Sequence, residues 1–143
     1  LERYLAHKGT RFAVGTTSLR TLESCHWMGV KILHGQPLED LGQFEAYSLN
    51  NTFSTEEAYS ALLDYLKTHK IQSTTLKTQL MIKPGYLIKS VKGIITNFHQ
   101  PGSTLLLLVS AGIGKRWQEV YQHALAEDYR FLSYGDSSLL YFD

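Results

Sequence analysis

The sequence predicts an α/β fold in which a mixed sheet is flanked by helices. Short runs that suit strands, such as residues 11–14 and 94–95, alternate along the chain with longer stretches of helical period. Residues 74–82 alternate between apolar and polar and lead through Pro84-Gly85 to residues 86–88, which predicts an antiparallel hairpin. With 43% hydrophobic and 19% charged residues, the composition is that of an ordinary globular protein. The 143 residues have room for one α/β domain, residues 1–143.

The first elements follow a strand–loop–helix order. Residues 1–8 have helical spacing and Gly9 is a natural stop, so they predict the end of a helix. Residues 11–14 predict a strand, 15–18 a loop and 19–28 a helix. The loop places Thr16, Thr17 and Ser18 where a helix begins, and such a position favours an anionic group. Simple capping of the helix by Thr17 or Ser18 explains the same residues.

The middle of the chain predicts two weak strands and a helix. Residues 30–33 and 44–49 are short stretches whose apolar residues suit weak strands. Ser54 and Glu57 form a capping box, and a helical period follows it as far as residue 69. The hairpin of residues 74–88 comes next.

The central stretch, residues 94–111, predicts a buried strand, a polar loop and a helix that is buried on every side. Gln100-Pro101-Gly102 has the composition of a turn, and Ser103 suits the N-cap of the helix. The loop thus carries Asn97, His99, Ser103 and Thr104 between two buried elements. A ligand site and a hydrogen-bonded structural loop both have this pattern. Beyond it, the sequence predicts an amphipathic helix over 117–125, a loop over 129–136 and a closing strand over 139–142.

Charge is unevenly distributed although the net charge is only +1. No acidic residue lies between Tyr65 and Trp117, whereas this segment contains eight lysines and arginines, and a basic face of this kind can attract phosphate. A solvated lysine-rich surface is the alternative. Cys25 is the single cysteine, so we expect a reducing, cytoplasmic location, with no signal peptide or membrane span. Because the chain begins at Leu1 and without Met, we expect it to be a fragment of a longer chain.

Few residues suggest chemistry by themselves. The six histidines have no metal-ligand spacing, so we expect no metal. His99 can exchange a proton near neutral pH, or simply bond the backbone. Arg20 and Arg130 can bind an anion in a bidentate way, although Arg20 can also pair with Glu23. Asp136 can act as a base or accept from a ribose, or serve as a turn residue.

Three stretches resemble one known family. They are residues 15–24 (GTTSLRTLES), 97–106 (NFHQPGSTLL) and 129–136 (YRFLSYGD). In this order they are similar to the C-terminal part of the S-adenosylmethionine:tRNA ribosyltransferase-isomerases of queuosine biosynthesis. The resemblance implies a transferase-isomerase that moves the ribosyl group of S-adenosylmethionine onto 7-aminomethyl-7-deazaguanine in the wobble position of a tRNA. The product would be epoxyqueuosine-tRNA, with adenine and methionine released.

The resemblance also implies roles for residues of this chain. His99 and Asp136 become candidates for proton transfer. Candidates for binding S-adenosylmethionine are Thr16, Thr17, Ser18, Arg20, Asn97, Ser103, Thr104 and Tyr134. Candidates for binding tRNA are Lys77, Lys83, Lys89, Lys92 and Arg130.

The sequence departs from the family pattern at three places. These are Gln100, where Leu is common, residues 112–115, and the 50–82 region, in which the helix of residues 54–69 is an expected insertion. A diverged, non-catalytic nucleotide- or RNA-binding module is therefore the alternative. A Rossmann methyltransferase is a weaker third interpretation, because no glycine-rich loop follows a first strand. Oligomeric state has no signature in the sequence.

Overall fold

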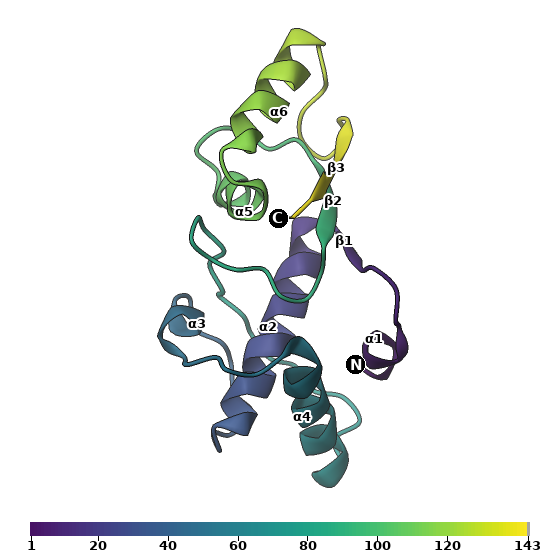
Figure 1. The fold of residues 1–143 in the computed structure, drawn as a ribbon, viewed down its shortest axis with the longest axis vertical. Helices are drawn as coiled ribbons and strands as arrows, with labels where there is room; N and C mark the ends of the chain where they lie inside the picture. Colours follow the sequence, from purple (N-terminus) through teal and green to yellow (C-terminus); the bar gives the residue numbers. More distant parts are fainter. Residues whose placement is uncertain (143) are drawn as a thin grey trace. The chain divides into compact units, whose positions relative to one another are not determined.

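A computed structural model describes residues 1–142, and within them three strands form a mixed sheet (Figure 1). The strands β1 (Phe12–Val14), β2 (Gly93–Asn97) and β3 (Ser137–Tyr141) lie in the order β1-β2-β3. β1 runs parallel to β2, and β3 runs antiparallel to it. The predicted mixed α/β fold is therefore confirmed, but the antiparallel pair joins β2 to the C-terminal strand instead of forming a hairpin at 74–88.

The two faces of this sheet differ in burial. Ala13, Ile94 and Leu140 are register partners across the three strands, and their exposed fractions are only 2%, 0% and 7%. Side chains alternate between the faces of a sheet, so the next row of partners points the other way. That row, formed by Val14, Ile95 and Leu139, is exposed. The sheet thus has one core face and one open apolar face.

The described chain divides into two compact units. The first contains residues 1–9 and 21–80, and the second contains residues 10–20 and those from Met81 onward. The helix α2 (Thr16–Leu33) has its first turn in the second unit and its remainder in the first. The single domain expected from the sequence stays a prediction.

In the second unit, two helices pack beside the sheet. α5 (Thr104–Ile113) contacts both β3 and α6 (Arg116–Ala126) (Figure 1). Ser103 is its N-cap, as predicted, because its hydroxyl accepts a 3.3 Å hydrogen bond from the N–H of Leu106. The prediction that α5 is buried on every side is wrong in part, since Leu107 is 41% exposed.

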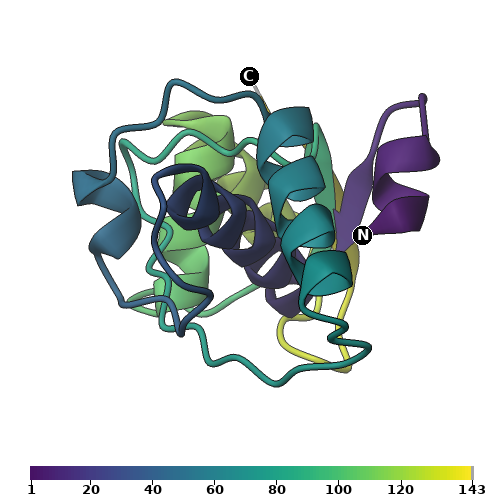
Figure 2. The same ribbon diagram turned by 90° about the horizontal axis from the view of Figure 1, so that it is seen from below.

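In the first unit, α4 (Thr55–Thr68) lies alongside α2 in both ribbon views (Figures 1 and 2). The predicted capping box is present: Ser54 accepts from the N–H of Glu57, and Glu57 accepts from the N–H of Ser54. The hydroxyl of Tyr59 donates to the carbonyl of Leu22 at 2.9 Å, and its ring stacks on Tyr4 of α1 (Glu2–Ala6). These contacts join α1, α2 and α4.

Two predicted strands are helical in the structure. Residues 30–33 continue α2, since the buried positions Leu19, Glu23, His26, Trp27 and Val30 recur at helical spacing. Residues 44–49 contain the short helix α3 (Glu45–Ser48), and Glu45 forms a 2.7 Å ion pair with the buried Lys31 of α2. α2 also begins at Thr16 and not at residue 19. In each case tertiary packing overrides weak local propensity.

The predicted strands at 74–82 and 86–88 are also absent. Among the described residues of this segment, β-type pairing is limited to one isolated bridge, between Thr78 and Leu41. Leu80 and Ile82 are buried while Lys77 and Gln79 are exposed, so the predicted alternation of faces is correct. Alternation reports an extended chain with one buried side, but it does not supply the neighbouring strand that would make a sheet.

Candidate functional site

A pocket of about 400 Å³ lies in the second unit, where the sheet meets its loops. It is formed by the β1–α2 junction, the end of β2, the loop before β3 and the start of α5. The lining residues are Val14, Gly15, Thr16, Thr17, Ile95, Thr96, Asn97, His99, Leu105, Leu132, Ser133 and Ser137. Among these residues His99 is the ionisable one, and the others are hydroxyl, amide or apolar groups.

The β1–α2 junction places a helix N-terminus at this pocket. Gly15 has φ of +86°, a conformation that suits glycine, and its N–H donates to the carbonyl of Ile95 at 2.8 Å. This bond continues the β1–β2 ladder by one residue, and the chain then turns into α2 at Thr16. Backbone N–H groups give a helix N-terminus a partial positive charge. The Thr16 and Thr17 side of the pocket therefore suits a carboxylate or a phosphate.

Asn97 joins the end of β2 to the loop that precedes β3. Its side-chain N–H groups lie 3.2 Å from the carbonyl of Gly135, 3.3 Å from that of Asp136 and 3.2 Å from the hydroxyl of Ser137. One amide thus meets three acceptors along one run of chain. The side chain predicted to bind a ligand fixes a wall of the pocket.

Residues 130–136 form a loop that is closed by two hydrogen bonds between Arg130 and Asp136. The N–H of Asp136 donates to the carbonyl of Arg130, and the Asp136 carboxylate accepts from the N–H of Arg130, each at 2.8 Å. Gly135 lies so close that a Cβ there would be 2.1 Å from the carbonyl oxygen of Arg130. Leu132, at the tip, has φ of +70°, and its N–H donates to the carbonyl of Phe98. A leucine in this conformation is strained, and such strain is often found at functional sites.

His99 is held at two points. Its ring atom Nε2 lies 3.0 Å from the hydroxyl of the buried Thr96, and its backbone N–H donates to the hydroxyl of Tyr121 at 3.0 Å. Among the described residues, no group is hydrogen-bonded to Nδ1. Partial burial lowers the pKa of His99 below its ordinary value. The ring is therefore neutral near pH 7 and can accept or donate a proton at Nδ1.

The structure brings four of the predicted site residues together, namely Thr16, Thr17, Asn97 and His99. Six others do not line the pocket: Ser18, Arg20, Ser103, Thr104, Tyr134 and Asp136. Ser103 caps α5, and Tyr134 is 97% exposed. Asp136 holds the loop closed through Arg130, which gives it a structural task. Roles of these six residues in binding or catalysis stay predictions.

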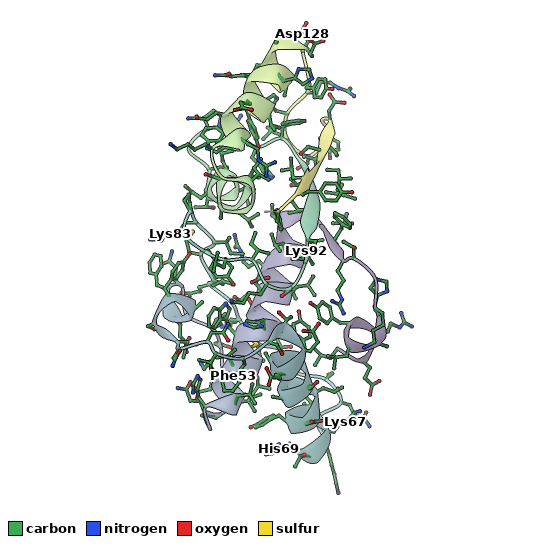
Figure 3. The ribbon with its side chains drawn as sticks, viewed as in Figure 1. Phe53, Lys67, His69, Lys83, Lys92 and Asp128 are labelled. Carbon is green, nitrogen blue, oxygen red and sulfur yellow. The ribbon has the colours of Figure 1, made fainter. Side chains whose placement is uncertain are left out.

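The predicted tRNA-binding residues are divided between the two units. Lys77 belongs to the first unit, and Lys83, Lys89, Lys92 and Arg130 belong to the second. Within the second unit, Figure 3 shows Lys83 and Lys92 apart from each other on separate stretches of chain. Arg130 is exposed, with its Nε 3.9 Å from the Asp136 carboxylate. A role for these cations in binding RNA stays a prediction.

Several residues that line or support the pocket were not predicted from the sequence. Thr96, Ser133 and Ser137 add hydroxyls to the pocket, and Tyr121 holds the backbone of His99 from α6. Ser133 lies inside the stretch 129–136 that the sequence singled out, so its signal was present. Tyr121 had no such signal, because its spacing indicated only the buried face of a helix.

Neither a metal cluster nor a membrane span is found in the described part of the chain. No three His, Cys, Asp or Glu side chains of residues 1–142 are grouped so that they could hold a metal ion. None of the helices described is both long and apolar enough to cross a bilayer.

All three stretches that carry the family resemblance contribute to this single pocket. Gly15 to Thr17 come from the first stretch, Asn97, His99 and Leu105 from the second, and Leu132 and Ser133 from the third. These stretches are far apart in the sequence, so their convergence is a property of the fold.

Comparison with known proteins agrees with the family resemblance. A profile of the queuosine biosynthesis protein family matches residues 1–140. An S-adenosylmethionine:tRNA ribosyltransferase-isomerase of Magnetococcus marinus is 36% identical over 142 residues, which are 99% of this chain and 28% of the relative. The protein of the same name from Stenotrophomonas maltophilia is 58% identical over 66 residues, which are 46% of this chain and 19% of the relative. The chain thus spans less than a third of the length of these curated relatives.

A solved structure is similar over a comparable range. The crystal structure of an S-adenosylmethionine tRNA ribosyltransferase from Thermotoga maritima aligns with 86% of this chain and 37% of that chain. The sequence identity is 29% and the TM-score is 0.43.

Proposed function

The chain belongs to the queuosine biosynthesis protein family. We propose that its pocket is part of the active site of an S-adenosylmethionine:tRNA ribosyltransferase-isomerase. The observation that supports the proposal most strongly is the convergence of the three family-like stretches on one pocket. A pocket lined by hydroxyls, an amide and a neutral histidine suits a sugar with an anionic substituent.

In this proposal the ribosyl group of S-adenosylmethionine is transferred to the aminomethyl group of 7-aminomethyl-7-deazaguanine in tRNA. The sugar is rearranged, epoxyqueuosine is formed, and adenine and methionine leave. His99 serves as the proton-transfer group through Nδ1, because burial lowers its pKa and leaves the ring neutral at working pH. The start of α2 at Thr16 and Thr17 binds an anionic group such as the methionine carboxylate.

We propose an RNA partner on the basis of the positively charged side chains. Lys83, Lys89, Lys92 and Arg130 of the second unit, with Lys77 of the first, supply cations that can neutralise phosphates. A tRNA substrate of this kind is found in the cytoplasm, which we propose as the location of the protein.

The alternative, a non-catalytic RNA-binding module, also has a specific observation in its favour. Of the proposed proton-transfer pair, His99 lines the pocket and Asp136 does not. Two proton transfers, one at the sugar and one at the departing adenine, would then need a second group from elsewhere.

Two radioactive forms of S-adenosylmethionine test the proposal on the protein expressed from its own gene. Label in the ribosyl group should enter tRNA that carries the deazaguanine precursor, whereas label in the methyl group should not. Transfer of the methyl label would support a methyltransferase, and RNA binding without transfer of either label would support the binding module.

Replacing His99 tests its role. His99→Ala should lower turnover by about a hundredfold or more, which is the usual contribution of a general acid or base. Binding of S-adenosylmethionine should change far less, because Thr16 and Thr17 remain. His69→Ala, at an exposed histidine of the first unit, is the matched control. Unchanged turnover in His99→Ala would remove His99 from the mechanism.

A further inference from the structure

A second hollow, of about 560 Å³, lies beside α6 and separate from the pocket described above. We call it the α6 groove. Three aromatic rings line it, those of Trp117, Tyr121 and Phe131. Tyr121 is buried and lies edge-on to the other two rings, so the aromatic wall is fixed by its own packing.

The polar part of the α6 groove is made of amides. Gln100, Gln118 and Gln122 line it and are exposed. Each glutamine side chain offers both donors and an acceptor, which are the groups that recognise the edges of a nucleobase. Aromatic faces beside such amides form the platform on which unpaired bases stack.

The charges around the α6 groove favour an anionic partner. The residues that line it include no carboxylate, and Lys115 and the first residue of α6, Arg116, are exposed next to Trp117. Glu119 lies on α6 but does not line the groove. A base stacked on Trp117 or Phe131 would therefore have cations within reach of its phosphates.

The α6 groove adjoins the proposed active site through Tyr121. The ring of Tyr121 lines the groove, while its hydroxyl accepts the hydrogen bond from the backbone N–H of His99. Gln100, which also lines the groove, follows His99 directly in the chain. An RNA that presents one base to the pocket at His99 thus has a neighbouring nucleotide close to the groove.

We infer that the α6 groove binds an unpaired nucleobase of the RNA, next to the base that is modified. This inference rests on the proposed function for its RNA partner. It assigns substrate contacts to Trp117, Phe131 and the three glutamines, and it predicts that the region of the RNA bound here is single-stranded.

The test is the affinity of the whole expressed protein for an anticodon stem-loop RNA. Leu125 lines the groove and is 67% exposed, so Leu125→Glu adds a carboxylate to it without disturbing the core. The variant should bind the stem-loop about tenfold more weakly, as expected when stacking of one base is lost. Leu33→Glu makes the same change of charge at an exposed leucine of the first unit and should bind as the wild type does.

Gln118→Ala with Gln122→Ala provides a second, uncharged probe of the groove. This double variant should also weaken binding, whereas Gln72→Ala with Gln79→Ala, at exposed glutamines of the first unit, should not. Equal affinities of Leu125→Glu and Leu33→Glu would overturn the inference. A change of oligomeric state in Leu125→Glu with unchanged RNA affinity would also overturn it, because the groove would then be a protein interface.

Failure of the inference can be told from failure of the proposed function. If ribosyl label still enters tRNA but Leu125→Glu binds RNA normally, the groove inference fails and the function stands. If no label is transferred but Leu125→Glu weakens binding of the stem-loop, the function fails, and the groove still binds RNA although it does not serve a modification reaction.

Discussion

Asn97 allows the sharpest test of how the pocket is built. Its side-chain amide is within hydrogen-bonding distance of Gly135, Asp136 and Ser137, at 3.2 to 3.3 Å. Asn97→Asp keeps the size and shape of the side chain but replaces both N–H donors with an oxygen. That oxygen would face two backbone carbonyl oxygens, so attraction becomes repulsion. We expect the loop of residues 130–136 to open more often, while the sheet stays intact.

The magnitude follows from the number of donors. One amide has two N–H groups, and each hydrogen bond contributes about 1 kcal/mol net. Losing both therefore costs about 2 kcal/mol, which raises the fraction of open loop by about thirtyfold. Repulsion adds to this figure, and access of water to the freed carbonyls reduces it.

Amide hydrogen exchange measures this opening directly. The N–H groups of Leu132, Gly135 and Asp136 are bonded within the loop or to Phe98, so they should exchange about thirtyfold faster in Asn97→Asp. The N–H groups of α4 should not change. Asn50→Asp, at an exposed asparagine of the first unit, is the control for charge. Wild-type exchange in the loop of Asn97→Asp would refute the claim that Asn97 fixes this wall.

Three further predictions concern the loop, the histidine and the first unit. Gly135→Ala should reduce the free energy of unfolding, measured in urea, by about 1–3 kcal/mol, because its Cβ would collide with the carbonyl of Arg130. The wild type should lose stability relative to His99→Gln as the pH falls below about 6.5, the pKa of an unfolded histidine, because burial lowers the folded pKa and disfavours the charged ring. Ser54→Ala should cost about 1 kcal/mol in urea unfolding, because it removes the cap of α4.

Each of these predictions has a clear contrary result. Wild-type stability of Gly135→Ala would mean that the loop is open at that point. A stability difference between wild type and His99→Gln that does not vary between pH 5 and 8 would mean that the ring is not buried in the folded state. Wild-type stability of Ser54→Ala in urea would mean that packing of Tyr59 stabilises α4 without its cap.

The elements that could be predicted from the sequence are those with strong local signals. Ser54 with Glu57, and Ser103 before an apolar run, mark the starts of α4 and α5 through side-chain caps that a short stretch specifies. Residues 30–33 and 44–49 have no such signal, and their helices depend on partners elsewhere, such as the pair Lys31 and Glu45. Local sequence does not encode those partners.

The residues of the candidate site also divide into those with a local sequence signal and those that depend on distant partners. Thr16, Thr17, Asn97 and His99 were predicted because the sequence pattern placed each of them in a short polar loop beside a strand and a helix. The hydrogen bond from Asn97 to Ser137, forty residues away, depends on the antiparallel pairing of β2 with β3. The sequence pattern predicted an antiparallel pair at residues 74–88 instead. The task of Asp136 in closing its own loop was likewise hidden, since a turn aspartate and a catalytic one have the same local pattern.

Adenine release from S-adenosylmethionine distinguishes ribosyl transfer from simple RNA binding. The protein expressed from its own gene should be assayed with tRNA that carries the deazaguanine precursor, with tRNA that lacks it, and without tRNA. We predict release that requires the precursor-bearing tRNA and that falls about a hundredfold or more in His99→Ala. Absence of release under all three conditions, with tRNA still bound, would contradict the proposed ribosyl transfer and leave the pocket as a binding site.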